Sequence, residues 1–279
     1  MIKQVASSPI RNIATVRHAV GNEFYDYELC SLCSYSPENV GQKSIVLDLA
    51  SPLTNPNVKT KIFDKSPYGN HAAITGATWV RLPSGLYVLS YDGIDDKAIV
   101  ASPVGMTWGT GDYTLMSWVY LTAYTTPDAD IASEIICANH SNYSTTKGAP
   151  AWGLAFYTDD HGTPASRRKF LFFGRSSLED YKSVLTTRTH VINTWYLVAG
   201  KRESGVCKIS VNGGAFESGD SGADMNATQP APLAIGISSH NQTSFGFNGK
   251  LSPIKVFNVA LSDAYVASLF NTERWQFGV

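Results

Sequence analysis

Carboxylate side chains are the first residues in this chain whose spacing could support chemistry. Retaining hydrolysis of a glycosidic bond needs two carboxyl groups about 5 Å apart, one as nucleophile and one as acid and base. Glu23 and Glu28 flank Asp26, but on a regular strand their spacing puts them on opposite faces. We interpret this stretch as solvated acidic surface, and we predict no catalytic residues and no enzymatic activity. A glycan hydrolase, or a lyase working with His, Tyr and Arg from separate strands, is the alternative.

The four cysteines do not have the spacing of a metal site. Cys30 and Cys33 form one C-x-x-C pair, and a structural zinc site needs a second ligand pair at similar spacing. Cys207 alternates with two apolar residues, as a small buried residue of a strand does. We therefore predict reduced thiols and no zinc.

Aromatic side chains in predicted loops and at predicted strand ends are the candidates for ligand binding. The face of such a ring complements the C–H face of a sugar, and the chain has 14 tyrosines and 6 tryptophans. Loops often carry the binding residues of a domain. The candidates for a glycan-binding face are Tyr68, Trp108, Tyr124, Tyr143, Trp152 and Tyr157.

Composition bears on the partners of the protein. The 279 residues carry a formal net charge of −1, so no global field favours nucleic acid or an anionic membrane. The one basic run, residues 167–169, is interpreted as a solvated strand end. No apolar run is long enough to span a bilayer, and residues 1–9 lack the apolar segment of a signal peptide. We expect synthesis in the cytosol, with assembly into a virion or other particle as one fate.

Short β-favouring runs separated by turn residues must position these side chains. Residues 113–121 are mostly apolar on both faces, which predicts a central strand covered on each side. Asp92-Gly93 and Asn212-Gly213 predict two tight hairpins, because both dipeptides accept positive φ.

The C-terminal part carries a helix signal and a strand interruption. Ser262 is a natural N-cap, Asp263 suits a first helical turn, and a short amphipathic pattern follows. Pro253 lies in a predicted strand and cannot donate to a ladder, so it requires an edge, a bulge or an amide that faces away.

Five motifs occur here in the order in which one family has them. The chain resembles the laminin-G-like, concanavalin-A-like jelly-roll family in its bacterial and phage form, over roughly residues 43–272. The matching residues are Asp64, Ser66, Gly69, Asn70 and His71; Gly76, Ala77 and Trp79; residues 89–96; residues 117–119; and residues 195–200, 209–213 and 247–262.

The strand pattern predicts an all-β fold, and the resemblance implies its type. We expect a two-sheet antiparallel β-sandwich, a jelly roll, with a short C-terminal helix. Residues 1–42 are predicted to be an extended N-terminal arm that could contain one strand, and residues 43–279 the laminin-G-like jelly-roll domain. Trp118 and Trp195 match the family's inner strands and are predicted to be core residues.

The resemblance also implies a calcium site, because many family members hold one Ca²⁺ with oxygen ligands. The candidate ligands are Asp64 and Asn70, with Asp92, Asp95 and Asp96 as further oxygen donors. Where the family has carboxylates in its closing strand, this chain has Ser252 and Pro253, so calcium should have at most a modest effect. His71 is expected to be a structural hydrogen-bonding residue and not a base.

Two classes of function stay open. The first is a structural or adhesive surface protein that belongs to a larger assembly and displays a glycan-binding face. The second is a carbohydrate-binding module of the lectin type. The arm carries apolar groups such as Ile13, Val16 and Phe24, and ordering it costs about 1–2 kcal/mol per residue in backbone entropy. We therefore favour the first class and expect the arm to contact other protein subunits.

Overall fold

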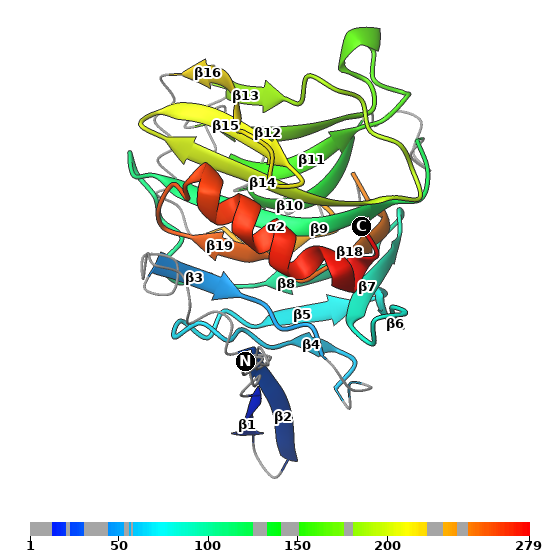
Figure 1. Ribbon diagram of the computed structural model, residues 1–279, viewed down its shortest axis with the longest axis vertical. Helices are drawn as coiled ribbons and strands as arrows, with labels where there is room; N and C mark the ends of the chain where they lie inside the picture. Colours follow the sequence, from blue (N-terminus) through cyan, green and yellow to red (C-terminus); the bar gives the residue numbers. More distant parts are fainter. Residues whose placement is uncertain are drawn as a thin grey trace, which may run out of the picture. The chain divides into compact units, whose positions relative to one another are not determined.

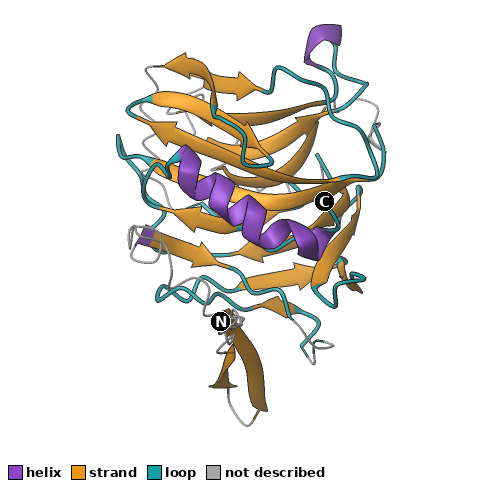
Figure 2. Cartoon of the chain, viewed as in Figure 1, coloured by secondary structure: helices purple, strands orange, loops and turns teal. Residues whose placement is uncertain are grey.

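The structure is a computed structural model with two compact units, Met1–Lys43 and Ser44–Val279. It describes residues 13–20 and 23–30 as backbone, and residues 44–52, 56, 58–124, 133–140, 151–175, 181–221, 231–238 and 245–279. Strands predominate in the described chain, as the orange arrows of Figure 2 show.

The first unit contains an antiparallel hairpin. Strand β1 (Ile13–Val20) pairs with β2 (Glu23–Cys30), in a register that runs from Ile13↔Cys30 to Val20↔Glu23. The described part of this unit therefore has two paired strands, where we expected an extended arm that could contain one. A Gly-Asn dipeptide separates the two runs in the sequence, and this dipeptide is itself a hairpin signal between β-favouring segments.

The second unit is an antiparallel sandwich of two sheets, as predicted. Among the described residues, one sheet has eight strands. Their order is β13 (Tyr181–Leu185), β12 (Lys169–Arg175), β11 (Ala151–Tyr157), β10 (Ser133–His140), β17 (Leu233–Ile235), β8 (Lys97–Val100), β5 (Ala72–Thr75) and β4 (Lys61–Ile62). A short 3-10 turn, η2 (Pro164–Ser166), precedes β12.

The other sheet is built around β9 (Tyr113–Leu121), which is buried on both faces as predicted. Its described order is β16 (Glu217–Ser221), β15 (Val206–Val211), β14 (Trp195–Glu203), β9, β18 (Asn248–Leu251), β7 (Tyr87–Asp92) and β6 (Thr78–Arg81). In addition, β19 (Lys255–Phe257) pairs with both β9 and β3 (Ile45–Asp48). Figure 1 shows the two sheets as layers of the same unit.

The segment from Asp92 to Lys97 is not the hairpin that the Asp-Gly dipeptide predicts. Strand β7 pairs with β6 and β18, whereas β8 pairs with β5 and β17, so the connection passes from one sheet to the other. Gly93 does adopt the positive φ, at 83°. The Asp92 Oδ1 accepts the Ile94 N–H at 2.8 Å, which closes a local turn that needs no strand pairing.

Pro253 divides the closing strand into β18 and β19, as its missing N–H requires. Ser252 continues the hydrogen bonding to β9 at this point. Its N–H donates to the Trp118 carbonyl at 2.9 Å, and its Oγ accepts the Trp118 N–H at 2.9 Å. A residue that departs from the family's pattern is thus used to satisfy the backbone of the central strand.

The C-terminal helix α2 (Asp263–Phe277) is longer than the short helix predicted. It begins where the Ser262 Oγ accepts the Tyr265 N–H and ends at Gly278, whose φ is 73°. Figure 1 shows it in red across the outer face of the β9 sheet. Trp118 and Trp195 are buried beneath it, so the core prediction for both is confirmed, although they lie under the helix and not between the sheets.

Candidate functional site

The outer face of the eight-stranded sheet carries an aromatic cluster. Along β11 the large side chains Trp152, Leu154 and Phe156 point into the core, so Tyr157 and the small residues before it face outward. Gly153 is required there, because a Cβ would lie 2.5 Å from the Cys137 carbonyl oxygen and 2.9 Å from the Phe173 Cζ. The Phe173 ring therefore lies across β11, and small residues form the base of the face.

Three tyrosine and phenylalanine rings define this cluster, which we call the outer-face platform: Tyr157, Phe173 and Tyr181. Phe173 and Tyr181 are stacked with ring centroids 6.0 Å apart, and the two tyrosines hydrogen-bond to each other. His161 stacks on Tyr157 at 4.0 Å. Tyr181 is 42% exposed, so its ring is available to a ligand, whereas Phe173 is 8% exposed and supports the Tyr181 ring by stacking on it.

Burial keeps both hydroxyls of the platform protonated. It raises the pKa of Tyr157, against the effect of the hydrogen bond from Tyr181. It also raises the pKa of Tyr181, and the neighbouring Tyr157 adds to the shift. The Tyr157 hydroxyl can therefore donate to a ligand at neutral pH, whereas the Tyr181 hydroxyl, which donates its proton to Tyr157, can accept from one.

Of the predicted aromatic candidates, Trp108 and Trp152 are core residues. Trp152 is 0% exposed and Trp108 8%, and Trp108 stacks on Tyr113 at 5.0 Å, so neither ring can present a face to a sugar. Their assignment to a binding surface is wrong, because strand ends and loops of a sandwich also fold over the core. Tyr143 lies outside the described residues.

The other candidates lie at opposite ends of the sheet. Tyr68 is 38% exposed and precedes β5, at the end where β8 finishes. Tyr157 pairs with Ser133 at the start of β10, which is the other end. Tyr124 lies near Tyr157, but the Arg168 guanidinium covers its ring at 4.1 Å. Sequence reasoning missed Phe173 and Tyr181. The strand of Phe173 is apolar on both faces, which indicates burial and not binding, and the strand of Tyr181 carries no such signal.

Glu134 is the only carboxylate on β10 to β13, and it faces the interior. Its Oε2 accepts the Asn248 N–H at 3.3 Å, and its Oε1 has no hydrogen-bond partner in the described structure. Burial raises the pKa of this carboxyl to about 8, against the effect of that hydrogen bond. These four strands therefore do not offer the carboxylate pair that retaining hydrolysis needs.

The buried Glu134 should make the stability depend on pH. Its folded pKa of about 8 lies above the ordinary value, so the folded state keeps a proton that the unfolded state loses. Stability should fall by about 2 kcal/mol between pH 5 and pH 7 from this group alone. Urea unfolding of Glu134→Gln at both pH values should lack this loss. Parallel pH curves for the two proteins would contradict the assignment.

Asp64 and Asn70 form a hydrogen-bonded brace and not an open ligand pair. Asp64 Oδ1 accepts the N–H groups of Asp48 and Ser66, at 2.8 and 3.0 Å. Its Oδ2 accepts the Ser66 hydroxyl at 2.6 Å and the Asn70 N–H at 2.8 Å. Each oxygen already holds two hydrogen bonds, which fill its usual capacity.

The Asn70 amide joins two loops. Its Oδ1 accepts the Val104 N–H at 2.7 Å, and its Nδ2 donates to the carbonyls of Val104 and Val46, both at 2.9 Å. His71 Nδ1 accepts the Asp64 N–H at 3.0 Å, which confirms its structural role. Calcium at Asp64 and Asn70 would have to displace this network.

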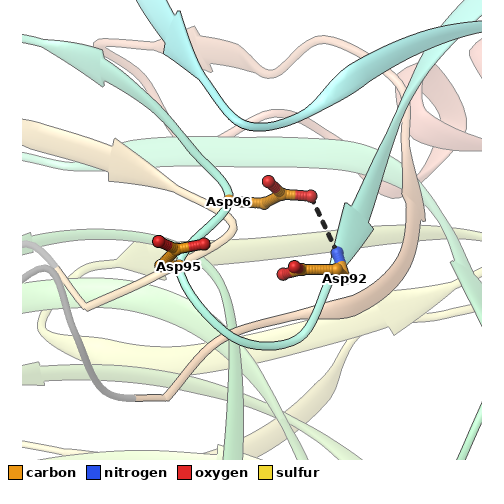
Figure 3. A group of neighbouring side chains, drawn as sticks. All are labelled: Asp92, Asp95 and Asp96. Carbon is orange, nitrogen blue, oxygen red and sulfur yellow. Dashed lines mark hydrogen bonds between the residues drawn. The ribbon is translucent and has the colours of Figure 1, made fainter.

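The further oxygen donors do come together. Ligand atoms of Asp92, Asp95 and Asp96 all lie within 4.8 Å of one another in the connection between β7 and β8, as Figure 3 shows. Burial raises the pKa of Asp96, and repulsion from Asp92 adds to it. The Asp96 Oδ2 accepts the Asp92 N–H at 2.9 Å, so part of the cluster is used to close the turn.

Comparison of the sequence with known protein families supports the fold assignment. Residues 92–267 match the concanavalin A-like lectin/glucanases superfamily. The chain belongs to this superfamily. The match starts at Asp92 and includes β8 to β19, and therefore all of the outer-face platform. No curated protein sequence matches the chain.

Solved structures with a similar fold are binding domains. The botulinum neurotoxin serotype D binding domain has a TM-score of 0.59 at 14% identity, over 84% of this chain and 53% of that one. The serotype C1 binding domain and that of Paraclostridial Mosquitocidal Protein 1 each have a TM-score of 0.57 at 14% identity, over 83% of this chain and 52% of theirs. This chain thus spans about half the length of those domains, and the likeness shows the fold.

None of the helices in the described part of the chain has the length and apolarity needed to cross a membrane.

Proposed function

We propose that the protein is a non-catalytic carbohydrate-binding module that binds glycans on the outer-face platform. The observation that supports this is the stacked pair Phe173 and Tyr181, with Tyr181 42% exposed on a sheet face. An exposed, supported ring is rigid, so it loses little conformational freedom when a sugar stacks on it. The tyrosine hydroxyls beside it supply directional hydrogen bonds.

The similar structures support a binding role. They are binding domains, and botulinum neurotoxin type C depends on two ganglioside molecules to get into cells. Another was solved in complex with rat synaptotagmin II. A protein is therefore a second kind of ligand among these similar structures, but the exposed Tyr181 ring favours a glycan here.

The platform can be tested by replacing Tyr181. We expect Tyr181→Ala to weaken glycan binding at least about fivefold, because an anchoring aromatic residue at an interface is worth more than 1 kcal/mol. Tyr181→Phe should retain most of the affinity, since the ring is kept. Trp275→Ala is the matched control, because Trp275 is 57% exposed on α2, over the other sheet. A glycan array followed by calorimetry measures this. An array without any bound glycan would overturn the proposal.

We also propose that residues 1–43 connect this domain to other subunits of an assembly, such as a virion or other particle. A two-stranded hairpin like β1–β2 is at best marginally stable in water by itself. It therefore needs a further surface to pack on. Light scattering of the chain with and without residues 1–43 tests this: loss of self-association supports it. An unchanged oligomeric state with a lower melting temperature contradicts it.

A further inference from the structure

The outward-facing positions of β10 to β13 carry two basic residues and no carboxylate. In these four strands Glu134 is the only acidic residue, and it points to the core. Two basic residues of β12, Lys169 and Arg175, share the outward alternation with Phe173. Lys169 lies opposite Tyr157 on β11, and Arg175 lies opposite Tyr181 on β13.

The polar groups of this face are therefore rich in donors. Lysine offers three N–H donors and arginine five, and neither accepts a hydrogen bond. Neutral sugars present hydroxyl groups, which need acceptors as well as donors to be held. A carboxylate or sulfate group accepts only, and it forms shorter, stronger hydrogen bonds with ammonium and guanidinium groups. The chemistry of this face matches an acidic sugar better than a neutral one.

The two cations differ in their surroundings. Lys169 is half-buried at the strand end next to Tyr157 and His161, so its ammonium can meet a ligand. Arg175 is buried at 5% exposure, and its charge opposes the rise in the pKa of Tyr181 that burial and Tyr157 cause. The guanidinium thus lies close to the Tyr181 hydroxyl, at the other end of the platform. Five residues of β12 lie between the two cations, so their Cα atoms are about 20 Å apart.

Two acidic residues, Asp159 and Asp160, lie in the turn that follows β11, and an ion pair neutralises the first of them. Asp159 is bound through both carboxylate oxygens by Arg168, at 2.7 and 2.6 Å. Arg167 Nε donates to the His161 carbonyl at 2.8 Å, which keeps a further positive charge at this end of the sheet. The basic residues at 167–169 therefore have different roles. Arg168 forms an ion pair, and Lys169 lies on the platform.

We infer that the platform binds acidic glycans, with a carboxylate or sulfate group of the sugar on Lys169 and the sugar rings over Tyr157 and Tyr181. This inference rests on the proposed function and names the class of glycan. Arg175 contributes as a positioning residue that holds a positive charge beside Tyr181.

Calorimetry with three probes tests the inference on the full chain: sialyllactose for the carboxylate, a heparin hexasaccharide for the sulfate, and lactose as the neutral sugar. At least one acidic probe should bind about tenfold or more tightly than lactose, and added salt should weaken it. Lys169→Met, which keeps the apolar stem, should weaken that probe about tenfold. Lys97→Met is the control, because Lys97 is a half-buried lysine on β8 of the same sheet.

The outcomes separate the inference from the proposed function. Lactose binding as tightly as both acidic probes, or an unchanged affinity in Lys169→Met, overturns the acidic-glycan inference and leaves a glycan-binding module. Loss of affinity in both lysine variants alike also overturns it, because a general charge effect would then explain the binding. An absence of binding by all three probes and by a glycan array overturns both. The stronger of the two acidic probes identifies the carboxylate or the sulfate as the group recognised.

Discussion

Replacing Trp118 with alanine should lower the free energy of unfolding by about 3–5 kcal/mol. The ring is 2% exposed and lies against Phe277, with the two ring centroids 4.2 Å apart. Its Nε1 donates to Glu273 Oε2 at 2.8 Å, and Lys255 pairs with Oε1 of the same carboxylate at 2.5 Å. The substitution therefore leaves a cavity under α2 and removes one hydrogen bond from a half-buried carboxylate.

Trp275→Ala is the matched control for this prediction. Trp275 lies on the same helix but is 57% exposed, so its removal should change the unfolding free energy by less than about 0.5 kcal/mol. Urea unfolding of both variants measures the difference. If Trp118→Ala unfolded at the same urea concentration as the parent, the packing of α2 on the sheet would be contradicted.

Strand β9, which is buried on both faces, could be predicted from the sequence because its signal is local. Residues 113–121 are mostly apolar at both odd and even positions, and only a strand covered on both faces accepts that pattern. The N-cap at Ser262 was equally local. The fold class followed from such patterns and from the family resemblance.

The crossing of the chain from one sheet to the other after β7 could not be predicted in the same way. Asp92-Gly93 specifies a sharp turn, and the turn is present, but a turn does not state whether the next strand pairs with the previous one. That choice depends on which partner strands, β5 and β17 here, arrive from elsewhere in the sequence. Long-range pairing overrides a short-range hairpin signal.

The binding face was only partly predicted, because its residues come from three strands. Tyr157 was identified from its place at a strand end, whereas Phe173 and Tyr181 join it only through the pairing of β11, β12 and β13. The alternation of large and small residues along β11 shows which face is packed, since bulky side chains fill the core. Trp152 belongs to the bulky set, and this is why it is buried.

Asp64→Ala should be as costly as the loss of Trp118. The Asp64 carboxylate is the acceptor for three backbone N–H groups, those of Asp48, Ser66 and Asn70. Each buried donor left without a partner costs about 1–3 kcal/mol, and the effects of neighbours are not additive, so we expect a loss of about 3–5 kcal/mol. Asp95→Ala, at an exposed position, should have little effect on stability.

The same network sets the response to calcium. Both Asp64 oxygens already accept two hydrogen bonds, so neither has a lone pair left to bind a cation. A ligand that binds weakly adds little to the free energy of unfolding. The melting temperature should therefore differ little between excess EDTA and millimolar Ca²⁺. A shift of several degrees that persists in Asp95→Ala and disappears in a folded Asp64→Asn protein would contradict this, and would make the brace a calcium site. A shift that disappears in Asp95→Ala instead would assign the ion to the cluster of Asp92, Asp95 and Asp96 and leave the brace a purely structural element.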